Sequence, residues 1–177
     1  MSSELSQLRA LVRDIPDFPT PGIVFKDITP VLLDPAGLGL AVAGLAEKAA
    51  PLGVQYVVAA EARGFILGAA LARELGAGFA PARRPGKLPH ETVRAEYALE
   101  YGYGALELHA DSLASGARVL VHDDLLATGG TARALCELVE GLGAKVVGCA
   151  FLIELSFLHG RDQLAPREVL ALIDYAD

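Results

Sequence analysis

Short apolar runs alternate with helical patterns along this chain, and this alternation constrains the fold more than any other feature of the sequence. Extended segments are expected at 23–28, 54–60, 79–82, 105–109, 118–122, 145–153 and 168–173. Helices are expected at 2–13, 35–50, 65–75 and 130–142. Strands that alternate with helices are typical of a parallel sheet with helices on its faces. The sequence therefore predicts an α/β fold with a central, mostly parallel sheet flanked by helices.

The chain length predicts a single domain over residues 1–177, because the sequence shows no internal repeat and no linker. Residues 83–104 contain three glycines, two prolines and mixed charge, and they are too long for an ordinary connection. This segment is therefore predicted to be a flexible loop that serves as a lid or a binding loop.

The charge of the chain excludes two classes of partner. Fifteen Lys and Arg residues against 22 Asp and Glu residues leave a formal net charge of −7. Nucleic acids and anionic membrane surfaces require a basic patch, so we expect no nucleic-acid partner and no membrane partner. A small polyanionic ligand would need a local group of cations on this acidic chain.

Cysteine usage and hydropathy indicate a cytoplasmic protein. Cys136 and Cys149 lie in apolar stretches without a Cys-x-x-Cys pattern, which favours buried free thiols over a disulfide or a zinc site. No uncharged stretch reaches the roughly 18 residues of a membrane span, and the N-terminal residues lack the apolar core of a secretory signal. The four histidines show no metal-ligand spacing.

The motif at 118–132 carries most of the chemical information. A buried strand runs into two adjacent carboxylates, Asp123 and Asp124, and then into Thr-Gly-Gly-Thr at the start of a helix. The glycines let successive N–H groups point outward at a helix N-terminus, which also favours an anion through its dipole. The motif therefore predicts a phosphate site beside carboxylates that accept hydrogen bonds from the vicinal hydroxyls of a sugar. The alternative is a polar strand end followed by a capped helix.

Several segments together resemble the type I phosphoribosyltransferase family, and in particular its adenine-specific members. They are the 118–132 motif, residues 15–28, Glu61-Ala-Arg-Gly-Phe65, and Gly86-Lys-Leu-Pro89 with Leu99-Glu-Tyr-Gly102. Further matches at Glu154-Leu155, Gly160-Arg161 and 164–166 extend the resemblance over nearly the whole chain. It implies the type I phosphoribosyltransferase fold. It also implies transfer of a 5-phosphoribosyl group from phosphoribosyl pyrophosphate to adenine, giving AMP and pyrophosphate.

The resemblance also implies roles for individual residues. Asp123 and Asp124 would bind the ribose hydroxyls, and the 5′-phosphate would be held by Ala127, Thr128, Gly129, Gly130 and Thr131. Arg63 would bind pyrophosphate, because a planar guanidinium suits two phosphate oxygens at once. Its alternative is a surface arginine in a turn. Mg²⁺ is expected to arrive with the substrate, so no metal ligands are predicted in the protein itself.

Residues 81–89 supply the local group of cations, namely Arg83, Arg84 and Lys87, without an anion among them. They are expected to neutralise pyrophosphate, and the resemblance implies that part of this segment reaches across a homodimer interface. The alternative is a solvated charged face. In the following loop, the resemblance makes Glu100 the general base that takes the N9 proton of adenine and the third catalytic residue beside the two aspartates. A solvent-facing loop acid is the alternative.

The base site is expected in an N-terminal hood of about residues 1–34, as the resemblance implies. Phe25 offers a flat apolar face, and backbone groups of Val24 and Lys26 would pair with the purine edge. A backbone carbonyl accepts a hydrogen bond from the 6-amino group of adenine but cannot pair with a 6-oxo group, which favours adenine over hypoxanthine and guanine. Leu125 and Leu126 would form the opposite wall. An ordinary core aromatic is the alternative for Phe25.

Two other functions share parts of this pattern. Xanthine phosphoribosyltransferases share the phosphate loop, and a panel of bases distinguishes them. Some transcription regulators keep the same fold as a binding module without catalysis, but they carry a DNA-binding domain and a basic surface. The net charge of −7 argues against that second class.

Overall fold

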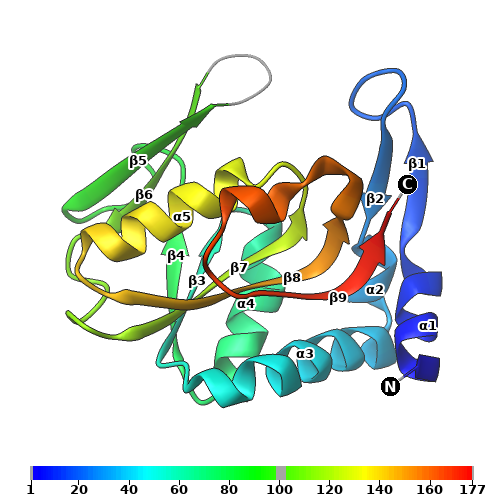
Figure 1. The fold of residues 1–177 in the computed structure, drawn as a ribbon, viewed down its shortest axis with the longest axis horizontal. Coiled ribbons are helices and arrows are strands. Elements are labelled where there is room, and N and C mark those ends of the chain that lie inside the picture. Colours follow the sequence, from blue (N-terminus) through cyan, green and yellow to red (C-terminus); the bar gives the residue numbers. More distant parts are fainter. Residues whose placement is uncertain (1, 99–102, 177) are drawn as a thin grey trace.

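The structure is a computed structural model that describes residues 2–98 and 103–176. The described residues form a five-stranded sheet in the order β4-β3-β7-β8-β9, and every neighbouring pair in it is parallel. Its strands are β3 (Tyr56–Ala60), β4 (Gly78–Ala82), β7 (Arg118–Leu126), β8 (Lys145–Leu155) and β9 (Val169–Tyr175). The predicted central parallel sheet is thus confirmed (Figure 1).

Helices cover both faces of this sheet, as predicted. One face carries α1 (Ser2–Leu11), α2 (Thr29–Leu33), α3 (Pro35–Ala49) and α4 (Arg63–Glu74). The other carries α5 (Gly130–Gly141) and an antiparallel pair, β5 (Thr92–Ala98) and β6 (Tyr103–His109) (Figure 1). Helix α3 begins where the sequence indicates, because Asp34 accepts a hydrogen bond from the amide of Ala36 and Pro35 occupies the first helical position.

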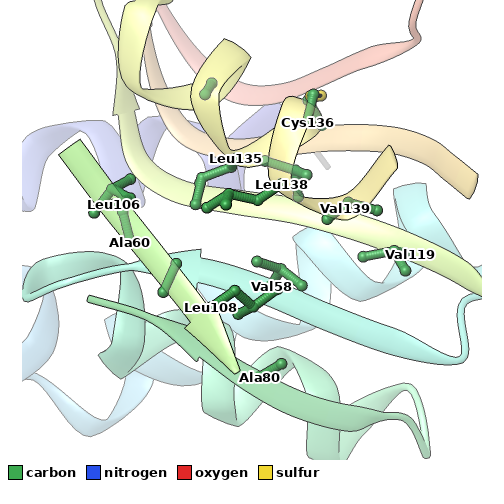
Figure 2. Close-up of a cluster of buried hydrophobic side chains, with 14 of the residues drawn as sticks. Val58, Ala60, Ala80, Leu106, Leu108, Val119, Leu135, Cys136, Leu138 and Val139 are labelled. Carbon is green, nitrogen blue, oxygen red and sulfur yellow. Dashed lines mark hydrogen bonds between the residues drawn. The ribbon is translucent and has the colours of Figure 1, made fainter. Parts of the chain in front are cut away.

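Alternation along the central strands divides the core between the two faces. Val58 of β3 and Val121 of β7 pack under α5, together with Leu135 of that helix and Leu108 of β6 (Figure 2). On the opposite face, Val57, Leu120 and Leu152 pack against α3 and α4, with Leu45 and Leu67 among their neighbours. Strands that are apolar on both faces are typical of a buried parallel sheet, which explains the continuous apolar runs in the sequence.

Most predicted element ends agree with the structure to within two residues, but three features differ. Strand β7 continues to Leu126 instead of ending at 122, because β8 extends alongside it and Leu126 pairs with Glu154. Strand β1 (Arg13–Pro16), which pairs with β2 (Val24–Asp27), and helix α2 were not predicted. The short 3₁₀ helices Ala50–Leu52, Ser156–Leu158 and Gly160–Gln163 complete the elements of the described residues.

The segment 83–104, which is predicted to be a flexible loop, contains regular secondary structure. Residues Thr92–Ala98 form β5 and pair with β6, and Val93, Ala95 and Tyr97 of β5 pack against the core under α5. The alternation of apolar and polar residues in this stretch is that of a half-buried strand. The tip of this pair, residues 99–102, lies outside the described residues.

The two cysteines confirm the predicted buried free thiols. Cys136 of α5 and Cys149 of β8 are both fully buried, and their sulfur atoms lie 3.6 Å apart. The hydrogen bond between them lowers the pKa of Cys136 and raises that of Cys149. In the described part of the chain, no helix has the length and apolar character needed to cross a membrane.

Candidate active site

The candidate site lies where the chain direction across the sheet reverses. From β3 the chain crosses to β4 on one side, whereas β7, β8 and β9 follow on the other side. In a doubly wound sheet of this kind, a crevice opens between the carboxyl ends of the strands at the point of reversal. Here those ends belong to β3 and β7. Residues 61–63, which follow β3, and residues 123–131, which end β7 and continue into α5, are thereby brought to one place (Figure 1).

The paired carboxylates, Asp123 and Asp124, lie near the C-terminal end of β7. Asp124 is 4% exposed, and its amide donates a hydrogen bond to Oδ1 of Asp123 at 3.0 Å. Loss of solvent and the neighbouring charge of Asp124 raise the pKa of Asp123 well above its ordinary value. Carboxyl oxygens are strong hydrogen-bond acceptors, so Asp123 and Asp124 are suited to bind hydroxyl groups.

The predicted phosphate loop borders a small hollow of about 60 Å³. Its lining comes from one continuous stretch of chain, with Asp123, Leu125, Leu126, Ala127, Thr128, Gly129, Thr131 and Ala132. Gly129 precedes α5 with a φ of 89°, a conformation that side chains with a Cβ rarely adopt. The turn expected from the two glycines is therefore present, and the first amides of α5 have no acceptor within the helix.

The predicted pyrophosphate residues are held by carboxylates from the ends of β3 and β7. Nε of Arg63 donates to Oδ2 of Asp124 at 2.7 Å. Arg83 and Arg84 each donate from Nε to one oxygen of Glu61, at 2.9 Å and 2.6 Å. Burial would raise the pKa of Glu61, but the hydrogen bonds from Arg84 and Arg83 outweigh it and lower that pKa. The cations gathered in the sequence are thus paired in the structure, and Lys87 is exposed beside them.

The predicted base residues lie on β2, next to the site. The ring of Phe25 meets that of Phe18 edge to face at 5.2 Å, and the guanidinium carbon of Arg63 lies 5.0 Å from the Phe25 ring centre. Arg63 therefore bridges the base face and the carboxylate of Asp124. Val24 beside Phe25 is 48% exposed.

The side chain of Lys26 is occupied away from the site. Its ammonium bonds to Asp14 at 2.8 Å and lies 4.1 Å above the ring of Tyr175. The role of Lys26 toward a base stays a prediction. Of the two predicted wall residues, Leu125 packs on the same side of the sheet as α2, whereas Leu126 is buried among the residues under α5. Adjacent residues of a strand point to opposite faces of the sheet, so Leu125 and Leu126 do not form one wall together, and that prediction is wrong.

Glu100, the predicted general base, lies outside the described residues. Among the described residues, no group of three or more His, Cys, Asp and Glu side chains could hold a metal ion. Beneath the site, His122 is fully buried and its Nδ1 lies 2.9 Å from the carbonyl oxygen of Ala150. Burial lowers the pKa of His122 to about 4.

Sequence reasoning missed residues that organise the site from a distance. The sequence assigns no role to Glu61 beyond its place in a motif, although Glu61 binds both Arg83 and Arg84. Gly160 and Arg161 were noted only for the resemblance, although Gly160 contacts the turn at Gly129. The sequence does show that Gly129 and Gly160 each lie soon after a predicted strand. Their contact could not be predicted, because it depends on the register between β7 and β8.

Comparisons with known proteins identify the family. A sequence profile described as the phosphoribosyl transferase domain matches residues 38–170. An adenine phosphoribosyltransferase from Nitrosococcus oceani is 56% identical over 171 residues, which cover 97% of this chain and 100% of that protein. The chain belongs to the adenine phosphoribosyltransferase family.

Solved structures of adenine phosphoribosyltransferases share its fold. That from Thermoanaerobacter pseudethanolicus superposes with a TM-score of 0.94 at 48% identity, covering 97% of this chain and 99% of the other. That from Saccharomyces cerevisiae, complexed with an imino-altritol bisphosphate and adenine, has a TM-score of 0.91 at 36% identity over 97% and 99% of the two chains. The predicted type I phosphoribosyltransferase fold is therefore confirmed.

Proposed function

We propose that the site at the ends of β3 and β7 transfers the 5-phosphoribosyl group of phosphoribosyl pyrophosphate to N9 of adenine, giving AMP and pyrophosphate. Membership of the adenine phosphoribosyltransferase family supports this reaction. The observation that carries the assignment of the site is the hollow that Asp123 shares with residues 127–131. It brings a sugar-binding carboxylate and a helix N-terminus within reach of one sugar phosphate.

In this proposal the ribose hydroxyls bind Asp123 and Asp124, and the 5′-phosphate accepts hydrogen bonds from residues 127–131. The buried Asp124 supports this role, because a fixed carboxylate loses little entropy when it binds a hydroxyl. Thr128 is exposed and Thr131 half-buried, so both hydroxyls can face a ligand at the start of α5.

The pyrophosphate would bind Arg63, Arg83, Arg84 and Lys87. The three arginines already meet carboxylate oxygens with the donor atoms that phosphate oxygens would use. Pyrophosphate would therefore compete with Glu61 and Asp124 for these donors. Mg²⁺ would enter bound to the substrate and neutralise part of the pyrophosphate charge.

Adenine would stack on Phe25 and pair with backbone groups of Val24 and Lys26, and Leu125 would close the other side. The exposure of Val24 and the diversion of the Lys26 side chain to Asp14 support recognition through the backbone. The adenine bound in the yeast relative fits this choice of base. Glu100 as general base stays a prediction.

Two further parts of the proposal concern assembly and compartment. We expect a homodimer, and the exposed apolar side chains of Leu33 in α2 and Ile66 in α4, 78% and 48% exposed, support apolar contacts with a second copy. Light scattering of the purified chain tests this. Two buried free thiols favour a reducing compartment such as the cytoplasm.

The test of the function is a panel of bases. The chain is incubated with phosphoribosyl pyrophosphate, Mg²⁺ and radiolabelled adenine, hypoxanthine, guanine or xanthine in parallel. AMP should form from adenine, with little nucleotide from the three oxo-purines. Absence of AMP, or equal turnover of hypoxanthine, would contradict the proposal, and preference for xanthine would identify the related xanthine enzymes instead.

A further inference from the structure

The segment after β8 packs directly on the phosphate loop. A Cβ on Gly129 would lie 2.5 Å from the carbonyl oxygen of Gly160, and a Cβ on Gly160 would overlap the carbonyl oxygen of Ala127. Gly160 also lies against Leu126, since its Cβ would come within 2.9 Å of a methyl group of that residue. Two backbones therefore touch where neither has room for a side chain, and residues 156–163 support the turn at residues 127–129 from one side.

An ion pair holds this segment to the sheet. Nε and one terminal nitrogen of Arg161 donate to the two carboxylate oxygens of Glu154, both at 2.6 Å. The other terminal nitrogen donates to the carbonyl oxygen of Val169 at 3.1 Å. Such two-pronged contacts fix orientation as well as distance. Arg161 thereby ties the 3₁₀ helix Gly160–Gln163 to both β8 and β9.

Glu154 is itself held rigidly. It is 4% exposed and lies in β8, where it pairs with Leu126 of β7 on one side and Asp174 of β9 on the other. Leu126 immediately precedes the phosphate loop. The carboxylate that holds Arg161 is therefore in register with the strand end from which the loop starts.

We propose that Arg161 and Glu154 are positioning residues for the 5′-phosphate of the substrate. They hold residues 156–163 against Ala127 and Gly129, and this contact keeps the first amides of α5 aimed at the phosphate. The inference rests on the proposed function of residues 127–131. The positioning effect should concern only the 5′-phosphate, because the predicted pyrophosphate residues Arg63, Arg83 and Arg84 are held by other acids, Asp124 and Glu61.

The experiment compares two lysine substitutions, each at an arginine that makes a two-pronged contact with a glutamate. Arg161→Lys keeps the charge but cannot make the two-pronged contact. Arg167→Lys is the matched control, since Arg167 makes the same kind of contact with Glu140, at 2.9 Å and 2.8 Å, toward the opposite end of α5. Calorimetry measures the affinity of each variant for ribose 5-phosphate and, with Mg²⁺, for pyrophosphate.

Arg161→Lys should lower the affinity for ribose 5-phosphate about 10-fold to 100-fold, which is the loss expected when binding groups are slightly displaced. Pyrophosphate affinity should stay within about twofold in both variants, and so should ribose 5-phosphate affinity in Arg167→Lys. The KM for phosphoribosyl pyrophosphate should rise in Arg161→Lys while the KM for adenine does not. An equal loss for both ligands, or no loss for ribose 5-phosphate, would overturn the inference.

A second pair of variants tests the same contact from its other side, should Arg161→Lys fail to fold. Gly160→Ala forces the segment away from Ala127 and should reproduce the selective loss for ribose 5-phosphate. Gly141→Ala, in open space at the end of α5, is its control. Wild-type affinity in Gly160→Ala would also overturn the inference. If the wild-type chain itself fails to bind ribose 5-phosphate, it is the proposed function of the loop that fails.

Discussion

The phosphate side of the site is held by backbone contacts and a buried acid, whereas the base side is held by ion pairs that face solvent. On the phosphate side, Gly129 meets Gly160 and the Glu154 side chain is 5% exposed. On the base side, Arg13 of β1 pairs with Asp27 of β2, but the arginine side chain is 57% exposed. Hydrogen bonds from Thr29 and Arg13 lower the pKa of Asp27 to about 2.

This difference follows the chemistry of the two halves of the substrate. A phosphate carries fixed charge, so donors that are already in place stabilise it without reorganisation. A purine is a flat, largely apolar body that is selected through a few edge contacts, and a strand with an exposed edge can supply those. The base side therefore tolerates a weaker attachment to the sheet than the phosphate side does.

The largest expected effect is at the boundary between the two sides. Asp123→Asn combined with Asp124→Asn should lower kcat about 100-fold to 10,000-fold, because two hydrogen bonds to charged groups are lost. The thermal unfolding midpoint should change little, because loss of the ion pair between Arg63 and Asp124 is offset by removal of the repulsion between the adjacent acids. Steady-state kinetics and calorimetry check both. A kcat close to that of the wild type would contradict the assignment of ribose binding to Asp123 and Asp124.

A smaller effect concerns the sheet beneath the phosphate side. The pKa of buried His122, about 4, lies below the 6.5 of an unfolded histidine, so the unfolded chain binds a proton first as pH falls. The contribution of neutral His122 to the free energy of unfolding is therefore fully present above pH 6.5. As the pH falls from 6.5 to 4, this contribution decreases by about 3 kcal/mol. The measurement is the unfolding free energy against pH, taken as wild type minus His122→Asn, so that the opposing titration of Asp123 cancels.

The control for this prediction is His159→Asn, because His159 is exposed and asparagine tolerates its φ of 54°. This variant should retain the acid sensitivity of the wild type. If His122→Asn retained it too, the buried imidazole would not be the group that titrates.

On the base side, Phe25→Ala should raise the KM for adenine about 10-fold to 100-fold through loss of a stacking face. The KM for phosphoribosyl pyrophosphate should change little. Phe18→Ala removes the ring that meets Phe25 edge to face and should have a smaller effect in the same direction. Initial-rate kinetics with each substrate varied distinguish these results. Equal increases for both substrates would mean that Phe25 supports the whole site instead of the base.

The smallest effect is expected at Lys26 and Asp14. The aspartate is 56% exposed, so Asp14→Asn should lower the unfolding free energy by less than about 1 kcal/mol. The difference from wild type should shrink further in high salt. Glu154→Gln is the comparison, and it should cost more because its carboxylate is buried. If urea titrations ranked the two variants in the reverse order, the contrast between the two sides would be wrong.

Much of this architecture could be predicted from the sequence, because it depends on local patterns. The apolar run at 119–121 and the glycines at 129 and 130 predict a buried strand, a turn and a helix in the order observed. Thr92–Ala98 shows the limit of this approach. Its alternation is visible in the sequence, but nearby prolines and charges favoured a loop, and only packing against α5 shows it to be a strand.

The partners of the charged residues could not be predicted, because they lie far apart along the chain. Arg63 and Asp124 are 61 positions apart, and Arg84 and Glu61 are 23 apart. Their meeting depends on β3, β4 and β7 being neighbours, which the strand order decides. The sequence shows a group of cations at 83–87 with no acid among them. In the fold, Glu61 from the neighbouring strand end pairs with two of these cations.

The burial of both cysteines has a practical consequence for labelling. Since Cys136 and Cys149 are closed off from solvent, thiol-directed dyes and spin labels should leave the native chain unmodified. A cysteine introduced on the exposed face of β5, for example at Arg94, would then carry the label without prior removal of native thiols. Paired with a second label on α3, it would report the distance between the β5–β6 pair and the opposite face of the sheet throughout the reaction cycle.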